Sequence, residues 1–102
     1  MAKVTFSAAD GTLCGYLYGE IDHDAAQELR AAVDAELAAR MPRLLVLDFS
    51  GVSFMDSSGV GLILGRMRRM QAIGGELRIL HPPAQIRRIL QIADIKVVEE
   101  EK

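Results

Sequence analysis

The sequence contains almost no cysteine, the residue that cross-links many small domains through disulfides or metal ions. Its 102 residues include one cysteine, Cys14, and no tryptophan. A lone cysteine excludes an internal disulfide and a Cys-x-x-Cys redox or zinc site, and it favours a reducing compartment, so we expect a cytoplasmic protein. No set of His, Cys, Asp and Glu residues shows the spacing of metal ligands. We therefore expect neither a metal nor a cofactor.

Long apolar runs and an excess of one charge are also absent. No apolar stretch approaches the roughly 20 residues that span a membrane, and Met1-Ala2-Lys3 is not followed by the apolar stretch of a signal peptide. Twelve Lys and Arg against 14 Asp and Glu leave a net charge of −2, without the basic excess that phosphate backbones attract. We expect no membrane partner and no direct binding of nucleic acid.

What is present is the composition of a folded domain with alternating elements. Half of the residues are hydrophobic and 25% are charged, which favours one globular domain over residues 1–102. The apolar patterns predict both strands and helices. The predicted strands span residues 3–7, 12–18, 44–49, 76–80 and 96–98, and the predicted helices span about 23–40, 58–73 and a segment that begins at Pro82-Pro83 and carries Ile86, Ile89, Leu90 and Ala93.

The order β-β-α-β-α-β-α-β predicts an α/β fold with a mostly parallel mixed sheet. The turn pair Asp10-Gly11 joins the first two strands into an N-terminal hairpin. The uninterrupted apolar run at 44–49 predicts a strand buried on both faces. In such sheets functional residues gather in loops after the carboxyl ends of the strands. The loops at 19–24 and 50–59 are therefore the candidate sites.

The sequence Asp-Ser-Ser-Gly at 56–59 is the most informative segment, and it allows two interpretations. Asp and Ser are preferred where a helix begins, because their oxygens accept hydrogen bonds from free backbone N–H groups. The segment could therefore be only a helix cap. A helix N-terminus also favours an anion, so one of the serines could instead accept a phosphoryl group. The motif by itself does not decide which serine that is.

Catalytic interpretations of the same segment fit poorly. A G-x-S-x-G nucleophile elbow centred on Ser57 requires glycine at position 55, where Met55 stands. The pair Gly59 and Gly61 begins a dinucleotide fingerprint, but Gly65 comes one position too late. We therefore expect no catalytic residues and no enzyme activity.

Two charged groups also have alternative interpretations. The acidic cluster formed by Glu20, Asp22 and Asp24 around His23 is explained either by capping and solvation of the next helix or by binding of a partner. The arginines at 66, 68, 69, 87 and 88 form either solvated helix faces or a docking patch for an acidic partner.

Residues 47–61 resemble the STAS domain of bacterial anti-sigma factor antagonists. The resemblance continues at 63–66, 74–77 and 86–90, and upstream at Gly-Glu-Ile-Asp-His, 19–23. It implies a protein whose unmodified form binds an anti-sigma factor with serine kinase activity and so releases a sigma factor. It further implies that the kinase phosphorylates Ser57, which separates the complex, and that a metal-dependent serine phosphatase restores the active form.

The resemblance also implies a partner-binding surface around the acceptor serine. The residues assigned to it are Glu20, Asp22, His23, Asp56, Ser58, Gly59 and Gly61. Asp56 is expected beside the acceptor, and the two glycines are expected to let the partner approach the helix closely. The alternative is a STAS module that is never phosphorylated and serves as a scaffold or accessory subunit of a stress-signalling or transport complex.

Overall fold

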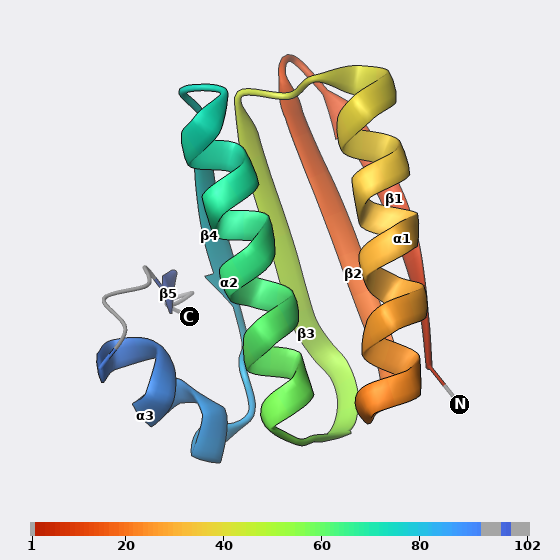
Figure 1. Cartoon of the computed structure of the whole chain (residues 1–102), viewed down its shortest axis with the longest axis vertical. Helices are drawn as coiled ribbons and strands as arrows, with labels where there is room; N and C mark the ends of the chain where they lie inside the picture. Colours follow the sequence, from red (N-terminus) through yellow and green to blue (C-terminus); the bar gives the residue numbers. More distant parts are fainter. Residues whose placement is uncertain (1, 93–96, 99–102) are drawn as a thin grey trace.

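The computed structural model describes residues 2–92 and 97–98, and its elements alternate as the sequence predicts. The elements are β1 (Ala2–Ala9), β2 (Thr12–Ile21), α1 (His23–Arg40), β3 (Leu44–Met55), α2 (Ser57–Ala72), β4 (Glu76–Leu80), α3 (Ala84–Ile92) and β5 (Val97–Val98). The strands form one sheet in the order β1-β2-β3-β4-β5 (Figure 1). The hairpin β1–β2 is antiparallel and the other pairs are parallel, which confirms the mixed sheet. Ala93, Lys96 and the C-terminal tail lie outside the described residues.

The long helices α1 and α2 lie side by side over one face of the sheet (Figure 1). The strand order explains this arrangement, because each crossover moves to the next strand in the same direction and right-handed crossovers then fall on the same side. The prediction that residues 44–49 are buried on both faces is therefore wrong. Leu45, Leu47 and Phe49 are buried beneath the helices, whereas the alternate residues of this segment are only half-buried.

The core lies between the sheet and the helices, and α1 contributes one apolar face to it. Its buried residues are Ala26, Leu29, Val33 and Leu37. On α2 the inner face carries the buried Leu62, Ile63 and Met70, while Val60, Leu64 and Met67 are only partly buried against the core. Each large apolar side chain that is fully buried contributes about 1.5–3 kcal/mol relative to exposure. Among the described residues, no helix is both long and apolar enough to cross a membrane.

Both strands that lead to the candidate site are longer than predicted. β2 continues past Tyr18 to Ile21, and β3 continues past Phe49 to Met55. The parallel pairing of β2 with β3 continues through two register shifts, and its last pair is Ile21 with Met55. The predicted loops at 19–24 and 50–59 therefore shrink to one residue between each strand and its helix. Extended pairing satisfies backbone groups that a loop would leave to water.

A buried ion pair links the two long helices. The Nε of Arg66 on α2 lies 2.9 Å from Oδ1 of Asp34 on α1, and the Arg66 side chain is only 8% exposed. Burial lowers the pKa of Arg66 from its ordinary value, and the Asp34 carboxylate opposes that shift. The i,i+4 spacing along α1 would also allow Asp34 to pair with Arg30, but the structure turns Asp34 toward Arg66. A buried guanidinium needs a counter-charge more than an exposed one does.

Candidate functional site

Two helix N-termini meet at the edge of the sheet where β2 and β3 end. Asp22 precedes α1 and its Oδ1 accepts from the backbone N–H of Ala25 at 2.9 Å. Asp56 precedes α2 in the same way, and its Oδ1 accepts from the backbone N–H of Ser58 at 2.8 Å. The two caps have nearly the same backbone angles, φ −99° and −96° with ψ −170°. Both aspartates therefore act as caps, as their positions predicted.

The two caps are also joined through the backbone. The N–H of Asp56 donates to the carbonyl of Ile21 at 3.2 Å, which fixes the start of α2 against the end of β2. Residues 19–23 and 56–61, which are more than 30 positions apart in the sequence, are thus brought to one edge. The predicted site residues from both loops lie in a single region of the molecule.

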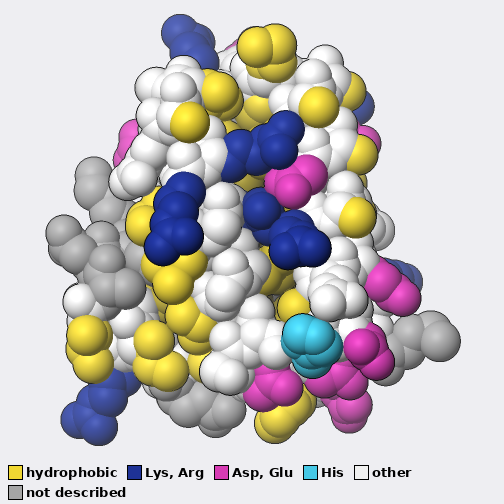
Figure 2. Space-filling view, in the orientation of Figure 1, with side chains coloured by type: hydrophobic (Ala, Val, Ile, Leu, Met, Phe, Trp, Pro, Cys, Tyr) yellow, Lys and Arg dark blue, Asp and Glu magenta, His cyan; other side chains and the backbone are white. Residues whose placement is uncertain are grey.

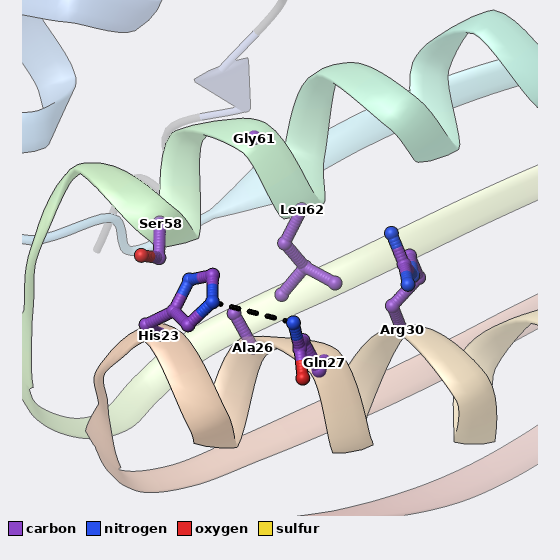
Figure 3. A pocket seen from close by; sticks show the side chains of 7 residues that line it. All are labelled: His23, Ala26, Gln27, Arg30, Ser58, Gly61 and Leu62. Carbon is purple, nitrogen blue, oxygen red and sulfur yellow. Dashed lines mark hydrogen bonds between the residues drawn. The ribbon is translucent and has the colours of Figure 1, made fainter.

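The structure separates the two serines that follow Asp56. Ser57 is the first residue of α2 and is exposed, whereas Ser58 is half-buried. Ser58 also lines a groove between α1 and α2, across from His23 (Figure 3). The Ser57 side chain is therefore accessible to another protein, and it stands at the positive end of the α2 dipole.

The two glycines of this segment have different surroundings. Gly59 is buried, and a Cβ added there would collide with the side chain of Met55, itself fully buried. Gly61 is exposed, and a Cβ there would meet nothing within 4 Å. Gly59 thus permits close packing of α2 on β3, and its effect on a partner would be indirect. Gly61 leaves space at the surface, where a partner could approach.

The difference between these glycines predicts opposite effects on stability. Gly59→Val is expected to lower the free energy of unfolding by about 2 kcal/mol, because overpacking of a core costs about 1–3 kcal/mol. Gly61→Ala is expected to raise it by about 1 kcal/mol, the difference in helix propensity between the two residues. Urea unfolding of both variants measures these changes, and equal effects would contradict the packing difference.

The groove between the helices has a volume of about 280 Å³. Its lining residues are His23, Ala26, Gln27, Arg30, Ser58, Gly61 and Leu62. The Gln27 amide nitrogen is 3.3 Å from Nε2 of His23, a long hydrogen bond along α1 (Figure 3). Sequence reasoning placed His23, Ser58 and Gly61 at the site but missed Gln27, Arg30 and Leu62, since nothing in the sequence shows which helix faces meet.

Acidic side chains line the edge of the sheet beside the groove. Glu20, Asp22 and Asp24 are all exposed, and Figure 2 shows acidic side chains gathered low on this face with basic side chains above them. Phe54, the register partner of Glu20, is 49% exposed although it is a large apolar residue. Aromatic residues, Phe among them, are enriched at the cores of protein–protein interfaces. Among the described residues, no group of three or more His, Cys, Asp or Glu side chains could hold a metal ion.

Comparison with known proteins identifies the family to which this fold belongs. The family model of the STAS domain matches residues 3–99. The chain belongs to the STAS domain family. Over 79 residues it is 39% identical to an anti-sigma F factor antagonist of Lysinibacillus sphaericus, a match that covers 78% of this chain and 68% of the relative. An anti-sigma F factor antagonist of Paenibacillus polymyxa is 33% identical, with 83% of this chain and 73% of the relative covered.

Solved structures of STAS proteins give the same result. The anti-sigma factor antagonist SpoIIAA in its unphosphorylated form superposes with a TM-score of 0.81 at 31% identity, covering 97% of this chain and 90% of that one. The Bacillus cell fate determinant SpoIIAA in its phosphorylated form gives 0.82 at 30% identity, with 98% and 93% covered. The STAS resemblance inferred from residues 47–61 is thereby confirmed, together with the fold that it implied.

Proposed function

We propose that this STAS protein is an anti-sigma factor antagonist whose binding is switched off by phosphorylation of Ser57. The unphosphorylated form binds an anti-sigma factor with serine kinase activity in the cytoplasm, and a sigma factor is released. A serine phosphatase returns the protein to its binding form. The protein acts by association, and no catalytic step is assigned to its own residues.

The exposure of Ser57 at the first position of α2 is the observation that carries this proposal. A kinase must reach the hydroxyl, and a buried serine would make the switch impossible. The curated relatives named above are anti-sigma F factor antagonists, and one of the similar structures is of a phosphorylated form. Both support the assignment of partner and modification to this chain.

The surface around Ser57 supports recognition by a protein partner. Asp56 holds the start of α2 through its cap, while Glu20, Asp22 and His23 are exposed on the neighbouring edge. Ser58 and Gly61 continue the surface into the groove. We assign these residues to the partner-binding surface, with Gly59 contributing through the packing of α2 and not through direct contact.

A phosphoryl group at Ser57 would act mainly through charge. It adds nearly two negative charges at neutral pH, next to a cap that is itself a carboxylate. The helix dipole partly stabilises such a group, so the fold of the protein need not change. The partner, in contrast, would contact a surface that has become more negative around Ser57, and its binding would be weakened.

Incubation with ATP and the anti-sigma factor of the source organism tests the modification. Mass spectrometry is expected to find one phosphoryl group on Ser57 in the wild-type protein and none in Ser57→Ala. The Ser57→Ala variant is expected to stay bound to the kinase in the presence of ATP. Stable binding of the wild-type protein without any modification would instead favour an unphosphorylated scaffold, and phosphorylation at Ser58 alone would refute the assignment of Ser57.

A further inference from the structure

The groove between α1 and α2 combines an apolar floor with one outward-facing cation. Ala26 and Leu62 are buried side chains at its base, and Gly61 leaves the wall on the α2 side without a side chain. Arg30 is exposed and lines the end of the groove farther along α1 from His23 (Figure 3). The groove has a volume of about 280 Å³, just below the usual range of small-molecule pockets, about 300–1,000 Å³. The shape suits a side chain inserted by another protein.

The charge of Arg30 is not neutralised by an ion pair with a neighbouring carboxylate among the described residues. The carboxylate one turn along α1, Asp34, is engaged by Arg66 at 2.9 Å and lies 3.9 Å from Arg69. Within residues 2–92 and 97–98, no ion pair of Arg30 is found. The positive charge of Arg30 repels that of Arg66. Burial is the main cause of the lowered pKa of Arg66, and this repulsion is a smaller one. An exposed guanidinium without an ion pair can meet a carboxylate that a partner brings to this face.

We propose that this groove receives an acidic side chain of the anti-sigma factor, with its carboxylate on Arg30 and the neighbouring apolar atoms of the partner on the floor formed by Ala26 and Leu62. The inference rests on the proposed function, because the partner is the anti-sigma factor. His23 and Ser58 belong both to the groove and to the surface around Ser57, so a partner that covers Ser57 also lies over the groove.

The charges on this face fix the orientation of the bound segment. Arg30 marks one end of the contact, while Glu20, Asp22 and Asp24 mark the sheet edge at the other end. A segment that binds with its acidic group at Arg30 is favoured over the reverse orientation, which would place that group against the carboxylates of the sheet edge. A phosphoryl group on Ser57 adds negative charge at the sheet-edge end of this contact.

Two variants of the groove and two matched controls test the proposal. Arg30→Glu reverses the cation, and Gly61→Leu places a side chain in the open space of the groove. Arg43→Glu makes the same charge change at the opposite end of the sheet, before β3, and Gly65→Leu makes the same glycine replacement one turn later on α2, where a Cβ also meets nothing within 4 Å. Calorimetric titration with the purified anti-sigma factor of the source organism measures the affinity of each.

Arg30→Glu and Gly61→Leu are each expected to weaken binding about tenfold or more, while both controls stay within about twofold of wild type. The wild-type affinity is also expected to fall more steeply with added salt than that of Arg30→Gln, because a charge pair is lost in the variant. Thermal unfolding of each variant near the wild-type temperature shows that the fold is intact.

The outcomes separate this inference from the proposed function. If the wild-type protein binds and both groove variants bind within twofold of it, the groove is not the contact, and the proposed function stands. If the wild-type protein does not bind the anti-sigma factor at all, the proposed function fails and the inference fails with it. Equal salt dependence of wild type and Arg30→Gln would overturn the role given to the carboxylate.

Discussion

An aspartate in place of Ser57 is expected to weaken binding of the anti-sigma factor by about 100-fold. One unit charge placed about 6 Å from a like charge of the partner, at an effective dielectric near 20, costs about 2.8 kcal/mol. Each 1.4 kcal/mol corresponds to a tenfold change in affinity. Titration calorimetry at low salt measures the loss, and a phosphoryl group, with nearly two charges, is expected to have a larger effect than aspartate.

Two variants control for causes other than charge at this position. Ser57→Ala removes the hydroxyl without adding charge and is expected to bind with wild-type affinity. Ser7→Asp adds the same charge at an exposed serine of β1, near the hairpin turn and away from the site, and is also expected to bind normally. Wild-type affinity in Ser57→Asp would show that charge at this position does not operate the switch.

The replacement of Asp34 by leucine is expected to lower the free energy of unfolding by about 2–3 kcal/mol. The change leaves Arg66, with its side chain only 8% exposed, without its counter-charge. Breaking a buried pair by removing one partner costs about 3–5 kcal/mol, and we reduce that range because Asp34 itself is 28% exposed. Urea unfolding of the variant measures the change in stability.

An exposed ion pair on the same helix provides the control. Arg40 and Glu36 are only 2.7 Å apart, yet their side chains are 53% and 32% exposed. Glu36→Ala is expected to cost no more than about 0.5 kcal/mol, because water screens such pairs. The double variant Asp34→Leu with Arg66→Met is expected to regain most of the stability lost by Asp34→Leu alone. A loss in the double variant as large as in Asp34→Leu would show that burial of Arg66 is not the cause.

Much of the candidate site could be predicted from the sequence because its parts are local. The caps at Asp22 and Asp56 depend on hydrogen bonds to residues three and two positions away, which a short stretch of sequence specifies. The lengths of β2 and β3 could not be predicted in the same way. Their last residues, Ile21 and Met55, are held by pairing with each other, and strand pairing joins positions far apart in the chain.

Local periodicity and capping are enough to predict the α/β class, the extent of α1 and the Asp-Ser-Ser-Gly turn that matches the STAS family. Three features are visible only in the folded chain. The helices α1 and α2 cover the same face of the sheet, and Ser57 is exposed while Ser58 lines the groove. Asp34 pairs with Arg66, and Arg30 has no ion-pair partner among the described residues. These features depend on strand order and on which helix faces meet. Both are set by burial of the core between residues distant in the chain.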